Sequence, residues 1–305
     1  MISTVFLGTP ASSIPSLEAA LRQTEVRLVI TRPDRPRGRS KAPQPSPVKE
    51  AAVRLGVKVA QPETRADLLE AIAKESPFDV GVVVAFGMLL PSRVLEIPRK
   101  GFVNVHFSLL PRWRGAAPVE RAILGGDEST GVTLMAMDRG LDTGAIISSR
   151  KTPIGSGETS GDLLERLTHL GASVLEEDLS SYVDGFLVPS PQRRGAATHA
   201  PKIESAEAHL PMDAPAGEVL RRIRAFNPRP GAFGLLEGKR LKIWVAGLAE
   251  RASLEPGELS VIGDDLCLGV GDGAVLLGEI QAEGSRRMAG LDWARGRRDS
   301  PGRLT

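Results

Sequence analysis

The chain has 305 residues, of which 41% are hydrophobic, and a formal net charge of +2. This length and apolar content allow two domains of ordinary size. The small net charge excludes a globally basic protein, so any nucleic-acid-binding surface must be a local patch. No run approaches ~20 continuous apolar residues, which excludes a membrane-spanning helix. The single cysteine, Cys267, excludes an internal disulfide and a cysteine metal cluster. We therefore expect a cytoplasmic protein without membrane contact, because the first residues also lack the basic start of a signal peptide.

The first two thirds of the chain alternate strand-like runs with helical periodicity. The run at 79–85 is apolar on both faces, which is typical of a parallel sheet covered by helices on both sides. The pattern predicts an α/β fold with a doubly wound, mostly parallel sheet. The predicted strands are 3–7, 26–31, 79–85, 101–105, 130–137 and 145–152, and the predicted helices are 14–21, 48–55, 64–75, 116–124 and 158–182.

The sequence pattern changes near residue 189. Residues 189–205 have no apolar periodicity and are typical of a linker. Beyond them, short strands at close spacing with Gly-rich turns indicate a small, OB-like β-barrel. We expect a first domain over 1–189, a linker over 190–208 and a barrel domain over 209–305. The barrel domain is predicted to contain a helix at 217–226 and strands at 232–237, 240–247, 257–262, 265–271 and 274–280.

Asn104 and His106 follow a short apolar run and lie two residues apart. In an extended chain their side chains project to the same face. The carboxyl ends of strands in open α/β sheets are where ligands bind. Asp138 and Asp142 lie in a Gly-containing loop, from which a carboxylate can orient an imidazole. Each motif alone also fits a purely structural role, as a packed pair and as a tight turn.

Two loops offer possible binding surfaces. Residues 86–90 form an apolar loop after a buried strand, suited either to core packing or to a flat heteroaromatic ring. Residues 31–49 form a basic loop, longer than the usual connection of about 2 to 6 residues. This loop is either a solvated connection or a phosphate-binding segment. The turn after the first strand has only Gly8 of the dinucleotide-binding glycine pattern, which argues against NAD.

Two segments, NVHFSLLPRWRGAAP and DRGLDTGAI, resemble the two signatures of the 10-formyltetrahydrofolate-dependent formyltransferases. Further segments in the same order are similar to the branch of this family that formylates methionyl-tRNA. They are GTP, TRPDRPRGRSK, SPVK, VVVAFGMLLP, RAFNPRPGAF and RRMAGLDWARG, and they cover nearly the whole chain. The resemblance implies a Rossmann-like formyltransferase domain, 10-formyltetrahydrofolate as the formyl donor and no metal. It also implies initiator methionyl-tRNA as the acceptor, and we expect a monomer.

The resemblance also assigns roles to individual residues. It implies that Asn104, His106 and Asp142 are catalytic. The folate contacts that it implies are Ser108, Leu109, Leu110 and Pro111, together with Phe86, Gly87, Met88, Leu89 and Leu90. The tRNA contacts that it implies are Arg35, Arg37, Arg39 and Lys41, with Arg39 as the most important. Phe107 departs from the Gly or Pro that is frequent at its position, and we expect its side chain to point away from the Asn104/His106 face.

Three alternatives fit parts of this pattern. A sugar-nucleotide formyltransferase shares both signatures but does not need the basic loop. A hydrolase that releases formate from the folate would turn over without an amine acceptor. An inactive tRNA-binding protein would not need the intact Asn104, His106 and Asp142.

Overall fold

The computed structural model describes residues 1–36, 42–193, 195–249, 254–297 and 301–305. The chain divides into two compact units, each discontinuous in sequence. We call them the sheet unit (Met1–Pro118, Ser129–Pro153 and Leu164–Ala200) and the barrel unit (Val119–Glu128, Ile154–Leu163 and Pro201–Thr305). The stretch before Ala200 groups with the sheet unit, although the sequence pattern there predicts a linker. The predicted domain boundaries, as limits of independently folding parts, stay a prediction.

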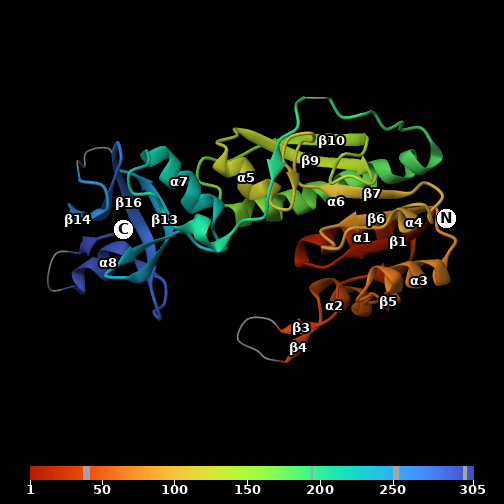
Figure 1. The fold of residues 1–305 in the computed structure, drawn as a ribbon, viewed down its shortest axis with the longest axis horizontal. Helices are drawn as coiled ribbons and strands as arrows, with labels where there is room; N and C mark the ends of the chain where they lie inside the picture. The colour runs from red at the N-terminus through yellow and green to blue at the C-terminus, as the bar shows by residue number, and fades with distance from the viewer. Residues whose placement is uncertain (37–41, 194, 250–253, 298–300) are drawn as a thin grey trace. The chain divides into compact units, whose positions relative to one another are not determined.

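One twisted sheet forms the centre of the sheet unit (Figure 1). Its strand order is β10-β9-β7-β6-β1-β2-β5. Strands β7, β6, β1, β2 and β5 are parallel, whereas β9 and β10 join the β7 edge as antiparallel strands. The predicted doubly wound, mostly parallel sheet is therefore confirmed. The strands are β1 (Ser3–Gly8), β2 (Glu25–Ile30), β5 (Val59–Ala60), β6 (Val80–Val84), β7 (Phe102–His106), β9 (Ser129–Ala136) and β10 (Ile146–Pro153).

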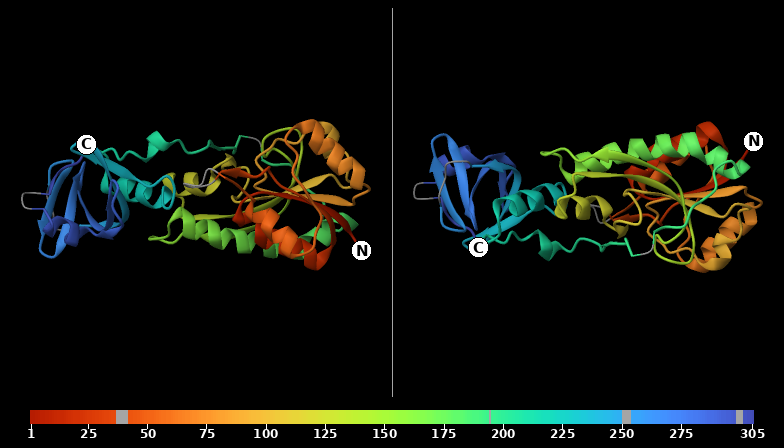
Figure 2. Two further views of the ribbon diagram at one scale, coloured as in Figure 1. Left: turned by 90° about the horizontal axis from the view of Figure 1, so that it is seen from below. Right: turned by 90° about the horizontal axis from the view of Figure 1, so that it is seen from above.

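Helices cover both faces of this sheet, which explains why every residue of β6 is buried (Figure 2). Helices α1 and α6 lie on one face, where Arg22 and Glu176 form an ion pair at 2.7 Å, and α3 packs with α4 on the other face. None of the helices among the described residues is long and apolar enough to cross a membrane. The helices of the first two thirds are α1 (Ile14–Gln23), α2 (Pro47–Arg54), α3 (Arg65–Glu75), α4 (Ser92–Leu95), α5 (Pro118–Leu124) and α6 (Ser160–Asp184).

The helix that follows the basic loop begins at a conventional cap. Ser46 precedes α2, and its Oγ accepts a hydrogen bond from the Lys49 backbone N–H at 3.0 Å. Pro47 occupies the first turn, where no backbone donor is required. The Ser46 Oγ also pairs with Thr31 Oγ1 at 2.6 Å, just past the end of β2. These bonds fix both ends of the basic loop to the sheet unit.

An antiparallel sheet curls into a barrel in the second unit (Figure 1). Its strand order is β12-β13-β16-β15-β14-β18, and reciprocal hydrogen bonds between Leu235 and Thr305 link its two ends. Helix α7 packs Val219 and Ile223 into the same apolar core as Ile280. The predicted small barrel is confirmed. Its elements are α7 (Ala216–Ala225), β12 (Phe233–Leu236), β13 (Lys239–Leu248), β14 (Glu258–Ile262), β15 (Asp265–Val270), β16 (Gly273–Ala282), β17 (Met288–Ala289), α8 (Gly290–Arg295) and β18 (Gly302–Arg303).

Several short elements were not predicted from the sequence. Two of them belong to the basic loop, where β3 and β4 form a small hairpin, and two others, β8 and β11, pair in parallel. Runs of two residues carry too little periodicity to be recognised. These elements are β3 (Arg35–Pro36), β4 (Pro43–Gln44), β8 (Arg114–Gly115), β11 (His199–Ala200), and the 3₁₀ turns at Ala11–Ser13 and Ser205–Ala208, and the short elements β5, α4, β17, α8 and β18 were not predicted either.

Candidate active site

A cavity of about 560 Å³ lies within the sheet unit, at the carboxyl ends of β6 and β7. Its lining includes Asn104 and His106 at the end of β7 and Asp142 from the loop between β9 and β10. Ligand sites in open α/β sheets lie at this edge. The three residues predicted to be catalytic therefore line one cavity.

The polar groups of these three residues converge on the Asp142 carboxylate. Oδ2 of Asp142 lies 3.7 Å from Nδ1 of His106, and Oδ1 accepts a hydrogen bond from Nδ2 of Asn104 at 3.5 Å. The Gly115 backbone N–H donates to Oδ2 at 2.8 Å. The side chains of His106 and Asp142 are only 6% and 14% exposed. Both side chains are therefore largely shielded from bulk water.

The second ring nitrogen of His106 determines the tautomer. Nε2 lies 2.9 Å from the backbone carbonyl oxygen of Trp113. Because a carbonyl oxygen only accepts, we assign the proton in this hydrogen bond to Nε2. Nδ1 is then the nitrogen that faces the Asp142 carboxylate. The site therefore presents one imidazole nitrogen beside a carboxylate, an arrangement able to take up a proton.

The apolar loop 86–90 lines the same cavity. Phe86 and Leu90 are buried and anchor the loop in the core of the sheet unit, whereas Leu89 is 54% exposed. Thr9 Oγ1 donates to the carbonyl of Phe86 at 3.0 Å, which ties the loop to the end of β1. Phe86, Gly87, Met88, Leu89 and Leu90 thus form an apolar wall of the cavity that also holds the polar groups.

Ser108, Leu109, Leu110 and Pro111 do not line this cavity in the structure. Ser108 is fully buried, and its Oγ donates to the Arg112 carbonyl at 2.6 Å. Thr133 Oγ1 donates to the Ser108 carbonyl at 2.7 Å. These bonds make the turn a rigid support for the loop that follows. The folate contacts predicted for residues 108–111 stay a prediction.

Phe107 lies on the opposite face from its neighbours Asn104 and His106. Its ring lies 3.4 Å from the position that a Cβ would take on Gly171 of α6. A side-chain atom of Val105, on the same face, lies 2.7 Å from that position. The Phe107 ring therefore lies against α6, as expected, although Phe107 is also among the residues that line the cavity.

The described part of the basic loop has one acidic partner. Asp34 pairs with Lys49 at 2.7 Å and also accepts from Gln61 Nε2 at 2.7 Å. Arg35 is exposed on the β3–β4 hairpin. The other predicted tRNA contacts, Arg37, Arg39 and Lys41, lie outside the described residues.

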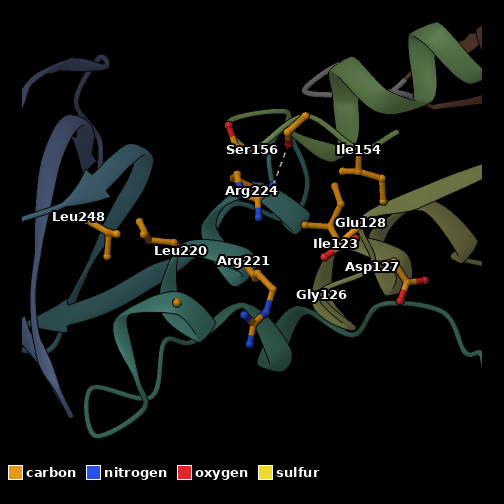
Figure 3. A pocket seen from close by; sticks show the side chains of 12 residues that line it. Ile123, Gly126, Asp127, Glu128, Ile154, Ser156, Leu220, Arg221, Arg224 and Leu248 are labelled. Atoms are coloured by element: carbon orange, nitrogen blue, oxygen red, sulfur yellow. Dashed lines mark hydrogen bonds between the residues drawn. The ribbon is translucent and has the colours of Figure 1, made fainter. Parts of the chain in front are cut away.

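A second cavity, of about 430 Å³, lies within the barrel unit (Figure 3). Arg221 and Arg224 of α7 line it together with Asp127 and Glu128. Burial, reinforced by the charge of Arg221, lowers the pKa of Arg224 from its usual value. The described lining has no imidazole and no side-chain amide, so this cavity offers no counterpart of the Asn104/His106 pair.

No group of three or more potential metal-ligating side chains occurs among the described residues of the chain.

Sequence reasoning missed the backbone supports of the site. Trp113 and Asp142 adopt positive φ angles of 62° and 52°, although neither is a glycine. Such conformations are costly and cluster at functional sites. Gly115, which donates to Asp142, has a φ of 127°. Of these three positions, only Gly115 has a residue type that indicates an unusual backbone conformation, because a positive φ favours glycine.

These features agree with comparisons to known proteins. The model of the formyl transferase family matches residues 6–179, and that of the formyl transferase C-terminal domain matches residues 202–298. A crystallised N-formyltransferase from Helicobacter canadensis, in complex with folinic acid and dTDP-3-aminofucose, is 21% identical. It superposes with a TM-score of 0.70 over 92% of this chain and 100% of its own, which shows the same fold. The fold and the site thus define a formyl transferase.

Curated relatives narrow this class. The methionyl-tRNA formyltransferase of Heliobacterium modesticaldum is 43% identical over 98% of this chain and 98% of its own length. That of Aromatoleum aromaticum is 45% identical over 97% of this chain and 94% of its own length. The chain belongs to the methionyl-tRNA formyltransferase family.

Proposed function

We propose that this protein transfers the formyl group of 10-formyltetrahydrofolate to the α-amino group of methionyl-initiator-tRNA. The observation that carries the proposal is the convergence of Asn104, His106 and Asp142 in one cavity of a chain so similar to full-length relatives of this activity. The product would be formylmethionyl-tRNA, the amino acid carrier that starts translation in bacteria.

The chemistry requires an attack by the amine and the removal of its proton. The amine nitrogen bonds to the formyl carbon, and negative charge develops on the formyl oxygen. The bond from that carbon to the folate nitrogen then breaks, and the folate nitrogen takes up a proton. A site that stabilises the developing charge and holds a proton during these steps accelerates the transfer.

Each of the three residues has a role that its geometry supports. The Asn104 amide presents an N–H group to the cavity, which suits the developing oxyanion. The proton of the amine passes to the space between His106 Nδ1 and Asp142 Oδ2, where two acceptor atoms face each other at 3.7 Å. The Trp113 carbonyl retains the other imidazole proton on Nε2 throughout. His106 and Asp142 therefore act together as the proton carrier.

The apolar wall of the cavity supports the proposed folate position. A pteridine is flat and largely apolar on its faces, and Gly87, Met88 and Leu89 line the same cavity as the polar groups. Because Phe86 and Leu90 are held in the core, the wall is formed before the ligand binds. A preformed wall lowers the cost of ordering the site.

The tRNA acceptor is supported by two basic regions. Arg35 is exposed at the root of the basic loop, whose remaining cations lie outside the described residues. In the barrel unit, Lys242 and Arg287 lie 5.3 and 3.7 Å from the centroid of the Trp244 ring, and Arg287 also pairs with Glu279 at 3.6 Å. Clustered cations suit phosphates, and their contacts make binding depend on salt.

We further propose that the protein acts in the cytoplasm and that it is a monomer. Sedimentation of the free protein tests the oligomeric state.

A competition between acceptors tests the proposed function. The wild-type protein, supplied with 10-formyltetrahydrofolate, should formylate methionyl-tRNA and leave an amino-sugar nucleotide unmodified. A tRNA already carrying an N-acetyl group on its methionine controls for folate hydrolysis, because it lacks the reactive amine. Preferential formylation of the sugar nucleotide contradicts the proposal, and so does equal release of formate with blocked and free tRNA.

A further inference from the structure

Two side chains that follow residue 189 hydrogen-bond the backbone of the loops that carry the site. They are Gln192 and Thr198, both in the sheet unit, in the stretch where the sequence predicts only a linker. Neither lines the cavity that holds Asn104, His106 and Asp142. Their contacts therefore act on the loops and not on the substrates.

Gln192 fixes the backbone of Asp142. Its Nε2 donates to the carbonyl oxygens of Asp142 and Gly144, each at 2.8 Å. Its Oε1 accepts from Nε and Nη2 of Arg114, at 3.0 and 2.6 Å. One side chain thus joins the Asp142 loop to the loop that follows β7. The bonds hold Asp142 at its positive φ of 52°, the conformation that directs its carboxylate to His106.

Thr198 fixes the backbone of Trp113. Its Oγ1 accepts from the Trp113 N–H at 2.8 Å, and its carbonyl accepts from the Arg114 N–H at 2.9 Å. Trp113 has a positive φ of 62°, and its carbonyl oxygen is the partner of His106 Nε2. Thr198 therefore acts on the imidazole through one peptide unit.

The short pairing of β8 with β11 completes this support. His199 and Ala200 pair with Arg114 and Gly115, and a Cβ on Gly115 would lie 2.6 Å from the Ala200 carbonyl oxygen. Only glycine allows this approach. The same Gly115 donates its N–H to Asp142. The two loops and the stretch after residue 189 form one hydrogen-bonded assembly around the proton carrier.

We propose that Gln192 and Thr198 are positioning residues of formyl transfer, which hold Asp142 and the His106 tautomer in the reactive geometry. The inference rests on the proposed function of the cavity. Backbone conformations with a positive φ cost energy in residues other than glycine, so they persist only where neighbours impose them. Without these bonds, Asp142 and Trp113 relax and the proton carrier loses its alignment. Groups that orient catalytic side chains typically change rates by about 10- to 100-fold.

Two substitutions remove the relevant bonds with little change of shape. Gln192→Glu keeps an acceptor for Arg114 and loses the donor to Asp142 and Gly144. Thr198→Val loses the hydroxyl, and Thr198→Ser retains it. Thr24→Val is the matched control, because the buried Thr24 hydroxyl donates to the Ala20 carbonyl at 2.8 Å, just before the amino end of β2 and away from the carboxyl ends of the strands that hold the site.

The measurements are the single-turnover rate at saturating substrates, the affinity for a folate analogue and the melting temperature of the full-length protein. Gln192→Glu and Thr198→Val should each lower the rate about tenfold with unchanged analogue affinity. Thr198→Ser should restore the rate, and Thr24→Val should retain it even if both valine variants melt earlier.

Rates within twofold of wild type in Gln192→Glu and Thr198→Val overturn the inference. An equal loss in Thr198→Ser, or in Thr24→Val, also overturns it, because the effect is then not that of this hydroxyl. A wild-type protein that does not formylate methionyl-tRNA overturns the proposed function and this inference with it. An active wild type with equally active variants overturns this inference alone.

Discussion

The sheet unit and the barrel differ in what they bury. The sheet unit buries polar side chains near its site, among them His106, Ser108 and Thr133. Among the described residues between 201 and 305, the buried side chains are apolar except for the thiol of Cys267 and the indole N–H of Trp244, and the segment Ile154–Leu163 of the barrel unit adds the buried Ser160. Buried polar groups must be hydrogen-bonded, and the bonds fix geometry at a cost in packing. The comparison shows that buried polar side chains, with the hydrogen bonds that fix their geometry, gather mainly in the sheet unit, whereas the interior formed by residues 201–305 is almost entirely apolar.

The largest effect is expected from the site itself. His106→Ala, Asp142→Ala and Asn104→Ala should each lower the single-turnover rate at least ~100-fold, the usual scale for lost acid–base or oxyanion partners. His169→Ala, at an exposed position of α6, is the control and should retain the rate. If the rates of the three variants lie within a few fold of wild type, these side chains do not have the proposed catalytic roles.

A matched pair of core substitutions, one in each unit, tests whether the two cores support different activities. Ile280→Ala in the barrel and Ile72→Ala in the sheet unit each empty a fully buried position and should cost about 3 kcal/mol. Ile72 packs in the same cluster as Phe86 and Leu90, so its loss should weaken folate-analogue binding. Ile280→Ala should spare that binding and reduce formylation of tRNA. Calorimetry and analogue titration measure both effects, and equal loss of analogue binding would contradict the predicted division into domains.

The contribution of exposed charges to tRNA binding is expected to be smaller and to depend on salt. Arg35→Ala should weaken binding of methionyl-tRNA and lower the slope of affinity against salt by roughly one unit, because one phosphate contact is lost. Arg54→Ala removes another exposed charge, at the far end of α2, and should leave the slope unchanged. Binding titrations at several ionic strengths decide the matter. Identical slopes for all three proteins would mean that Arg35 does not contact the tRNA backbone.

The smallest effect concerns an ion pair within the barrel unit. Arg121 hydrogen-bonds Glu207 through two contacts, at 2.7 and 2.9 Å, and holds the pKa of that carboxyl below its usual value of 4.5. A lowered folded-state pKa adds stability above the unfolded value, and this stability is lost as pH falls through the folded value.

Glu207→Gln should therefore destabilise the protein by about 1 kcal/mol near neutral pH and have little effect well below pH 4.5. Chemical denaturation at both pH values measures the difference. Glu63→Gln, which removes an exposed carboxylate, is the control. A loss that persists in acid would show that the pair does not act through the charge of Glu207.

The sequence predicts the regular elements well because their signals are local. Strand β6 and helix α6 each repeat an apolar pattern over enough residues to be recognised. Asn104 and His106 were predicted to share a face because their spacing alone determines it. The supports of the site were not predictable in the same way. Gln192 lies 50 positions from Asp142 and Thr198 lies 85 from Trp113, and such contacts form only when the chain has folded.

The pairing of β8 with β11 has a consequence for the exchange of modules between relatives. A protein engineer who replaces the barrel with that of another enzyme would choose the irregular stretch near residue 189 as the junction. Such a hybrid would carry residues of the other enzyme at positions 192 and 198 and in β11, the strand that pairs with Gly115. A junction after Ala200 keeps the donor of every one of these bonds with its acceptor. The peptide after residue 189 thus belongs with the sheet unit, and recombination there separates residues that hydrogen-bond one another.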